Sequence, residues 1–310
     1  MSKLAFLFPG QGSQYAGMGR SLAQSYPLAR QAFEEADAVL GFPLSRLCFE
    51  GPEEELRLTE NTQPAIVATS VAAWRILEAN GIRADYVAGH SLGEYSALVA
   101  ARSLSYPDAL RLVRKRGRFM QEAVPPGEGA MAALIKLPEQ ALEPILQQAA
   151  QGQVVSAANF NSPDQIVIAG HRAAVERAIE LAKASGARKA VLLPVSAPFH
   201  CPLMRPAQQR MRQELEEVVF QELQIPLVNN FQAMLVHSGA QARQGLIEQI
   251  PNPVRWTESM RQLARLGVTR CIEVGPGRVL AGLMKSIVPE IRVLPFGEAA
   301  DLEALREVAA

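Results

Sequence analysis

The pentapeptide Gly89-His90-Ser91-Leu92-Gly93 constrains the fold more than any other stretch of the chain. A short apolar run at 86–88 predicts a buried strand before it, and a helix is predicted after it. Two glycines around a serine at a strand-to-helix junction are typical of a sharp turn that lifts the serine hydroxyl above a sheet. The same turn points the backbone amide of Leu92 at a bound carbonyl group. The pattern favours Ser91 as a nucleophile; the alternative is a glycine-bounded turn with an incidental serine.

Strand and helix patterns alternate along the rest of the chain. Strands are predicted at 4–8, 226–230 and 271–274, and helices at 63–79, 108–123, 204–219 and 259–266. Such alternation predicts an α/β fold on a mostly parallel sheet, with functional loops at the carboxyl ends of the strands.

Residues 129–194 show a separate pattern. Strands are predicted at 130–137, 154–159, 165–169 and 188–193, with helices at 138–150 and 173–185 and a turn at 161–164. This order, βαββαβ, is the ferredoxin-like arrangement. We therefore predict a small subdomain at 129–194, inserted into an α/β body formed by 1–128 and 195–310.

Charge and cysteine content exclude several classes of protein. The chain has 31 basic and 31 acidic residues among its 310, so its net charge of zero argues against a general nucleic-acid binder. Its three scattered cysteines offer no disulfide framework, and no spacing of His, Cys, Asp or Glu suggests a metal. No apolar run approaches the roughly 20 residues that cross a bilayer, and Pro9-Gly10 interrupts the first run, which is not a secretory signal. We expect a cytoplasmic protein that binds neither membrane nor nucleic acid.

A serine nucleophile needs a base, and the chain has four histidines. His90 adjoins the serine and should point away from it, His171 begins a predicted helix of the insert, and His237 lies in a polar loop. His200 lies in an irregular segment, 196–202, where the insert rejoins the body. A loop at such a junction faces a cleft, so His200 is the best candidate for the base.

Arg116 lies on the apolar face of the helix predicted at 108–123. With 100° per residue, it falls within the stripe of Ala109, Leu112, Val113 and Met120. A buried arginine must be paired, because an unpaired buried charge costs several kcal/mol. Its partner is either a protein carboxylate or a carboxylate on a ligand, and the pattern alone favours the protein carboxylate.

The loop Gly10-Gln11-Gly12 could bind a phosphate group or contribute to an oxyanion hole. It lacks the lysine of a phosphate-binding P-loop, and Tyr15 occupies the third glycine position of a dinucleotide-binding fingerprint. Its backbone amides are instead suited to one half of an oxyanion hole.

Taken together, these segments resemble the malonyl-CoA:acyl-carrier-protein transacylase family. The matching stretches run in order along nearly the whole chain: Phe8-Pro9-Gly10-Gln11-Gly12-Ser13-Gln14, Gly89-His90-Ser91-Leu92-Gly93-Glu94-Tyr95-Ser96-Ala97, Arg116-Gly117-Arg118-Phe119-Met120-Gln121-Glu122-Ala123, Asn159-Phe160-Asn161-Ser162-Pro163, Pro198-Phe199-His200, Val228-Asn229-Asn230, Asn252-Pro253-Val254-Arg255-Trp256 and Glu273-Val274-Gly275-Pro276-Gly277. The resemblance implies an α/β-hydrolase-like body with a ferredoxin-like insert, which is the architecture expected above.

The resemblance also implies a ping-pong acyl transfer. Ser91 would be acylated by malonyl-CoA, with His200 taking its proton and returning it to the departing thiol. An amide carbonyl at Gln249 would orient the histidine, and the backbone amides of Gln11 and Leu92 would form the oxyanion hole. With His200 as the base, the acylation rate should rise with pH as the histidine loses its proton.

Substrate selection follows from the same resemblance. Arg116 would bind the free carboxylate of the malonyl group and thereby select it over acetyl, which would leave the guanidinium unpaired. Phe199 favours malonyl over methylmalonyl, although the Ala197-Pro198 context before it departs from the common glycine-containing version. Asn159 would lie near the active site.

The substrates implied are malonyl-CoA and a 4'-phosphopantetheinylated acyl carrier protein, without a further cofactor, and the enzyme is expected to be a monomer. The carrier is acidic, so basic side chains near the cleft are candidate contacts: Lys183, Arg188, Lys189, Arg278 and Lys285. Fatty-acid synthesis is the expected pathway, and a free-standing acyltransferase of a polyketide synthase is the alternative. Two further alternatives are a serine hydrolase, which would need Ser91 and His200 alone, and a carrier-protein docking module with an inactive site.

Overall fold

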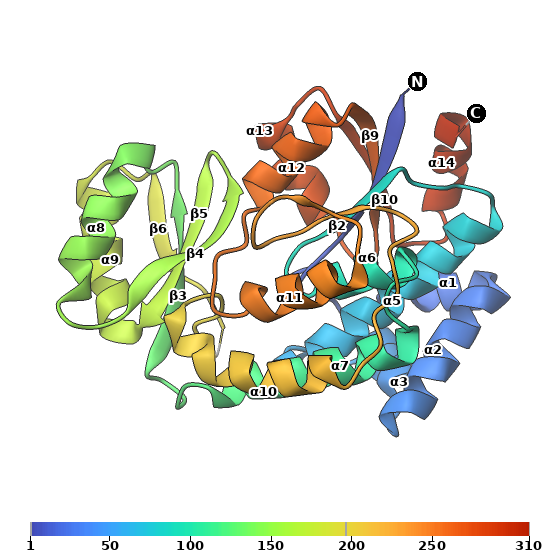
Figure 1. The fold of residues 1–310 in the computed structure, drawn as a ribbon, viewed down its shortest axis with the longest axis horizontal. Coiled ribbons are helices and arrows are strands. Elements are labelled where there is room, and N and C mark those ends of the chain that lie inside the picture. Colours follow the sequence, from blue (N-terminus) through green and yellow to red (C-terminus); the bar gives the residue numbers. More distant parts are fainter. Residues whose placement is uncertain (1, 196, 310) are drawn as a thin grey trace.

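The computed structural model describes residues 2–195 and 197–309; residue 196, in the irregular segment before His200, lies outside this range. Two separate sheets organise the chain (Figure 1). The larger has six strands in the order β10-β9-β1-β2-β7-β8, parallel throughout except for the final pair. Its strands are β1 (Lys3–Phe8), β2 (Tyr86–Gly89), β7 (Leu227–Val228), β8 (Leu235–Val236), β9 (Val268–Val274) and β10 (Arg292–Phe296).

Side chains alternate between the two faces of this sheet because successive residues of a strand point in opposite directions. In β1, Phe6 and Phe8 join a large core that includes the helices of the first half of the chain. Ala5 and Leu7 join a second core, on the other face, together with α12 (Trp256–Arg265) and α13 (Val279–Ile287). Burial on both faces explains why β1 is apolar from Leu4 to Phe8.

The other body helices lie before and after the insert. They are α1 (Arg20–Ser25), α2 (Pro27–Leu40), α3 (Leu44–Glu50), α4 (Glu53–Leu56), α5 (Thr59–Ala79), α6 (Gly93–Ala100), α7 (Tyr106–Glu122), α10 (Arg205–Glu216), α11 (Gly239–Gln249) and α14 (Asp301–Ala309), with a 3-10 turn, η2 (Pro202–Met204), before α10. Among the helices of the described residues, none combines the length and hydropathy required to cross a membrane.

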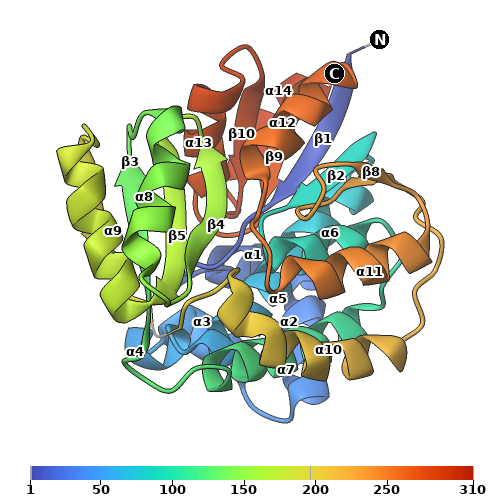
Figure 2. The same ribbon diagram turned by 60° about the vertical axis from the view of Figure 1, so that its left-hand side comes forward.

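The smaller sheet forms the insert, which Figure 2 shows beside the body. Its elements are β3 (Gly129–Ile135), η1 (Glu139–Ala141), α8 (Leu142–Ala150), β4 (Val155–Ser162), β5 (Gln165–His171), α9 (Arg172–Ala184) and β6 (Lys189–Leu192). All its pairs are antiparallel, in the order β4-β5-β3-β6. The predicted fold class, an α/β body with a mostly parallel sheet plus a βαββαβ insert, is therefore confirmed; the residue boundaries of the two parts stay a prediction.

The insert is attached to the body along β4. The backbone amide of Phe160 donates to the carbonyl of Val254, and the amide of Val254 donates to the carbonyl of Ala158, each over 2.9 Å. Asn159 forms a parallel bridge with Val254 between these bonds. The attachment places β4, an edge strand of the insert, beside α12 and α13 of the body.

The sequence-based boundaries were wrong in several places. The helix predicted at 63–79 begins at Thr59, and the turn predicted at 161–164 is shorter because Ser162 still pairs with Gln165. The strand predicted at 226–230 is only Leu227–Val228, because the next residues turn at once into β8.

Candidate active site

The turn after β2 is strained and tightly packed. Ser91 has a φ of 51°, a left-handed conformation that non-glycine residues seldom adopt. The glycines at 89 and 93 allow it, because a Cβ on Gly89 would overlap the backbone of Gly93 and a Cβ on Gly93 would overlap the carbonyl oxygen of Phe8. Ser91 is thereby held between β2 and the first turn of α6, as the strand-turn-helix pattern predicted.

Ser91 and His200 form a hydrogen-bonded pair. The Oγ of Ser91 lies 2.7 Å from Nε2 of His200, and Nδ1 of the same ring lies 2.9 Å from the backbone carbonyl oxygen of Gln249. That carbonyl requires a proton on Nδ1, which leaves Nε2 free to accept the serine proton. Burial, and secondly the charge of Arg116, lower the pKa of His200 to about 3. The ring is therefore neutral at physiological pH.

The predicted buried position of Arg116 is confirmed, with 1 % of the residue exposed. Gly117 lets α7 approach α5 closely, since a Cβ there would lie 2.6 Å from the carbonyl oxygen of Thr59. The approach brings the guanidinium against neutral groups only: Nη1 donates to Oε1 of Gln63, and Nη2 donates to Oε1 of Gln249 and to Oγ of Ser91, over 2.9, 2.9 and 3.1 Å. In the described chain no carboxylate contacts this guanidinium, and its Nε–H has no partner.

A buried polar cluster lies behind the serine. Asn230 accepts the backbone N–H of Ser91 at Oδ1 and donates from Nδ2 to the carbonyl of Gly89, each over 2.6 Å. Oε2 of Glu94 accepts the backbone N–H of Asn230 and the Nε2–H of Gln249, each over 2.9 Å. Burial raises the pKa of Glu94 to about 7, against the lowering effect of these donors and of Arg116.

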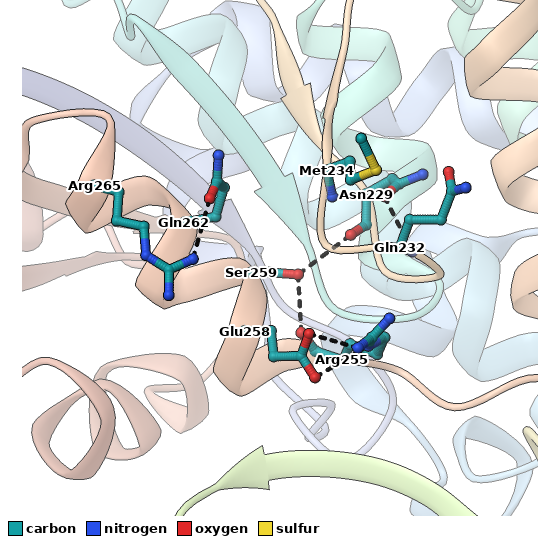
Figure 3. A network of polar contacts seen from close by, with 8 residues as sticks. All are labelled: Asn229, Gln232, Met234, Arg255, Glu258, Ser259, Gln262 and Arg265. Carbon is teal, nitrogen blue, oxygen red and sulfur yellow. Dashed lines mark hydrogen bonds and ion pairs between the residues drawn. The ribbon is translucent and has the colours of Figure 1, made fainter.

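The loop that carries Asn230 is anchored from α12 (Figure 3). Oγ of Ser259 donates to the backbone carbonyls of Asn229 and Arg255, and Oδ1 of Asn229 accepts the backbone N–H groups of Gln232 and Met234. These bonds fix the turn between β7 and β8. The short, tight hairpin thus positions the amide of Asn230 under the serine.

Gln11 and Leu92, the two residues predicted to supply an oxyanion hole, both border the cavity at the serine hydroxyl. Gln11 follows β1 and Leu92 precedes α6. Neither amide has a hydrogen-bond partner within the described residues. Free N–H groups beside a nucleophile, one of them at a helix N-terminus, are suited to stabilising an oxyanion.

The cavity between body and insert has a volume of about 330 Å³. Ser91, His200 and Arg116 line it, as do Asn159 of β4 and Phe199, so it brings the predicted site residues together. Gln249 lies behind it, in contact with His200 and Arg116.

His90 also lines the cavity, but its ring contacts residues other than Ser91. Its Nε2 lies 2.8 Å from Oδ1 of Asn161 on β4, and its ring contacts that of Trp256 edge-on. Because its partners lie on the insert and on α12, it takes part in holding the two units together. It does not compete with His200 for the serine.

Sequence reasoning missed four polar residues of the site: Gln63, Glu94, Asn161 and Asn230. One signal was present for Glu94, the only charged residue in a helix that is buried on every side. In the part of the chain that the structure describes, no group of three His, Cys, Asp or Glu side chains is placed to hold a metal ion.

Comparison with known proteins places this site in context. The family described as acyl transferase domain matches residues 5–292. The malonyl CoA-acyl carrier protein transacylase of Escherichia coli K12 is 48 % identical over 309 residues, covering 99 % of this chain and 100 % of that protein. The crystal structure of an acyl carrier protein S-malonyltransferase from Vibrio cholerae matches with a TM-score of 0.96 and 47 % identity, covering 98 % of this chain and 100 % of that one. The malonyl-transacylase PlMCAT, in complex with the type II PKS acyl-carrier protein AntF, matches with a TM-score of 0.97 and 47 % identity, covering 99 % and 100 %.

Proposed function

This chain belongs to the malonyl-CoA:acyl-carrier-protein transacylases of the acyl transferase family, and on that premise we propose how its residues perform the transfer. The protein is an acyltransferase that moves the malonyl group of malonyl-CoA to an acyl carrier protein, a step of fatty-acid synthesis. The transfer proceeds through a malonyl ester on Ser91, so that each substrate meets the same site in turn.

Acylation begins with the Ser91–His200 pair. Nε2 of His200 takes the hydroxyl proton as Oγ attacks the thioester carbonyl of malonyl-CoA. The oxyanion that forms accepts hydrogen bonds from the backbone amides of Gln11 and Leu92. The C–S bond then breaks, and the proton on His200 passes to the departing sulfur. The backbone carbonyl of Gln249 keeps the ring oriented and stabilises its transient positive charge.

Transfer to the carrier protein reverses these steps. The phosphopantetheine thiol gives its proton to Nε2 of His200 and attacks the malonyl ester, and the same amides hold the second oxyanion. When the C–O bond breaks, His200 returns the proton to Oγ of Ser91. The proposed mechanism uses no cofactor in addition to the two substrates.

Arg116 selects the acyl group. Its guanidinium carries a buried charge whose direct neighbours are neutral, so a carboxylate that enters the cavity supplies the missing counter-charge. An acetyl group supplies none and leaves the charge unpaired. Phe199 narrows the same cavity and disfavours a branched acyl group.

The observation that carries this proposal is the contact between the guanidinium of Arg116 and the hydroxyl of Ser91. The test is the kcat/KM of Arg116→Ala for malonyl-CoA and for acetyl-CoA. We expect malonyl transfer to fall at least about a hundredfold while acetyl transfer is retained or improves. Undiminished malonyl transfer would contradict the role of Arg116, and an equal loss for both substrates would assign it to the nucleophile instead.

One relative supports a second candidate for the acceptor. PlMCAT, which is 47 % identical to this chain, forms a complex with a type II PKS acyl-carrier protein. Side-by-side assays with a fatty-acid carrier protein and a polyketide carrier protein test the choice, and a higher kcat/KM for the fatty-acid carrier is expected.

The proposal extends to the cell compartment, the oligomeric state and the contacts with the carrier protein. All three cysteines are free and buried, which suits a reducing compartment such as the cytoplasm, and we expect the enzyme to act as a monomer. Of the basic side chains considered for carrier contact, Lys183 pairs with Glu180, and Arg278, with 73 % of its side chain exposed, lies 3.6 Å from Asp301. Surface pairs of this kind are weak, so both cations remain accessible to an acidic partner.

A further inference from the structure

Gln249 contributes two separate groups to the site, its backbone carbonyl and its side-chain amide. Its backbone carbonyl accepts from His200, which is the orienting bond already described. Its side-chain amide lies apart from that bond, between the guanidinium of Arg116 and the carboxylate of Glu94. The side chain is fully buried, so the second set of contacts is a fixed part of the interior.

The orientation of this side-chain amide is determined by four hydrogen bonds. Oε1 accepts from Nη2 of Arg116 over 2.9 Å. Nε2 donates to Oε2 of Glu94 over 2.9 Å, to the backbone carbonyl of Ser91 over 3.1 Å and to Oδ1 of Asn230 over 3.4 Å. Rotating the amide by half a turn would place N–H against the guanidinium and oxygen against three oxygens. All four bonds would then be lost, and the buried groups would be left without partners.

Glu94 makes the shortest of the three contacts from Nε2, and its acceptor is the only carboxyl oxygen among them. It is completely buried, and its Oε2 also accepts the backbone N–H of Asn230. Its other oxygen, Oε1, has no partner within the described residues. Oε2 accepts the Gln249 amide whether the carboxyl group is protonated or ionised, so the contact persists across neutral pH.

The consequence concerns the charge of Arg116. A carboxylate in direct contact would hold the guanidinium but also neutralise it, leaving nothing to attract an acyl carboxylate. Here Glu94 lies one amide away, and the part of Gln249 that touches Arg116 is its neutral amide oxygen. The guanidinium is held in place without being paired.

We propose that Glu94 and the side chain of Gln249 form a positioning pair that selects the acyl group: Glu94 fixes the amide of Gln249, and the amide holds Arg116 in place while leaving its charge available to the substrate. The inference rests on the proposed role of Arg116 as the carboxylate-binding group.

The experiment measures kcat/KM for malonyl-CoA and for acetyl-CoA in Gln249→Met, Glu94→Met and the double variant, with a holo carrier protein as acceptor. Gln249→Met keeps the backbone carbonyl that orients His200 and removes only the amide. We expect malonyl transfer to fall about tenfold or more in each single variant, with acetyl transfer within about threefold of wild type. In the Gln249→Met background, Glu94→Met should change kcat/KM for malonyl-CoA by no more than about twofold. The amide through which Glu94 acts on Arg116 is already absent there.

Two controls separate selection from loss of fold. Glu94→Gln keeps an acceptor oxygen and should retain the malonyl-to-acetyl ratio within about threefold. Glu273→Met removes another completely buried glutamate, which accepts the backbone N–H groups of Leu280 and Ala281 and, within the described residues, is hydrogen-bonded to neither Arg116 nor Gln249. It should lower the melting temperature and leave the ratio unchanged. If Glu94→Met does not fold, Gln249→Glu carries the test: a carboxylate in direct contact with Arg116 should lower malonyl transfer at least about a hundredfold and spare acetyl.

Three results would overturn the inference: a parallel loss of both substrates in Gln249→Met, additive effects of the two single changes, or unchanged malonyl transfer in Gln249→Glu. Arg116→Ala distinguishes these from failure of the proposed function. Suppose that Arg116→Ala abolishes malonyl transfer while Gln249→Met keeps the wild-type ratio of malonyl to acetyl transfer. The arginine then binds the carboxylate, but Glu94 and Gln249 do not position it.

Discussion

The guanidinium of Arg116 donates a hydrogen bond to the hydroxyl of Ser91 over 3.1 Å, the same hydroxyl that lies 2.7 Å from His200. The proposed nucleophile and the proposed carboxylate-binding group are therefore in contact in the structure. In the proposed mechanism, acylation of Oγ would cost the guanidinium this acceptor, and the malonyl carboxylate would replace it. Selection and chemistry would then take place within one hydrogen-bonded cluster.

The first prediction concerns pH and corrects the expectation from sequence. A histidine with an ordinary pKa would give an acylation rate that rises near pH 6.5, but burial and Arg116 lower the pKa of His200 to about 3. The ring is then already a free base above about pH 4, so no rise from His200 is expected between about pH 5 and 8. Rapid-quench measurements of the acylation step against pH check this.

Arg116→Ala provides the control for that profile. Without the neighbouring charge, the pKa of His200 should increase, so acetyl transfer by the variant should begin to fall at a higher pH than in wild type. A step near pH 6.5 in the wild-type acylation rate would contradict the neutral, buried histidine.

The second prediction is a pH-dependent gain in stability from Glu94→Gln. Burial raises the pKa of Glu94 from 4.5 to about 7, so the folded state holds a proton that the unfolded state has lost. The stability associated with that proton is complete below about pH 4.5 and is lost as pH rises to 7. Glutamine does not titrate, so relative to wild type its free energy of unfolding should increase by about 3 kcal/mol between these limits. Urea unfolding at about pH 5 and 8 measures the difference, and an equal difference at both pH values would contradict it.

The third prediction concerns the glycines of the turn at Ser91. Gly89→Ala and Gly93→Ala each place a Cβ inside neighbouring backbone, which cannot move without displacing β1 or α6. We expect each to lower the free energy of unfolding by more than about 3 kcal/mol or to prevent folding. Gly282→Ala is the matched control: that glycine lies in α13 with open space around its Cα, so the change should stabilise the protein by up to about 1 kcal/mol. Wild-type stability in Gly89→Ala would refute the packing of the turn.

The fourth prediction is that Asn230 supports catalysis with both acyl donors and does not discriminate between them. Asn230→Ala removes the acceptor of the Ser91 amide and the donor to the carbonyl of Gly89. Because these bonds hold the turn itself, we expect acylation by malonyl-CoA and acetyl-CoA to slow by the same factor, with a loss of about 2 kcal/mol in unfolding free energy. Steady-state assays with both donors measure the ratio, and a loss confined to malonyl would place Asn230 with Arg116 instead.

The sequence was most informative where local patterns determine the structure. Ser91 follows from a glycine pattern within five residues, and Arg116 from its place on one helical stripe. His200 followed from elimination among four histidines, and the structure brings it within 2.7 Å of the serine. The βαββαβ order of the insert could also be predicted from local patterns, because each of its strands and helices is short and separately bounded.

What the sequence did not reveal depends on contacts between distant segments. Asn230 reaches Ser91 across 139 positions of the chain, and Gln63 reaches Arg116 across 53. The short strands β7 and β8 depend on such pairing, because β7 pairs with the distant β2 and β8 pairs with β7. Whether the partner of Arg116 was a protein or a ligand carboxylate also remained open, because the answer depends on Gln249 lying between Arg116 and Glu94.

The most direct test of the account is the intact mass of the protein after mixing with malonyl-CoA, for wild type and Ser91→Ala, before and after addition of holo carrier protein. We expect a malonyl adduct on wild type alone, which disappears as the same mass increase appears on the carrier. An adduct on Ser91→Ala, or one that is lost equally fast without the carrier, would contradict transfer through a malonyl ester of Ser91.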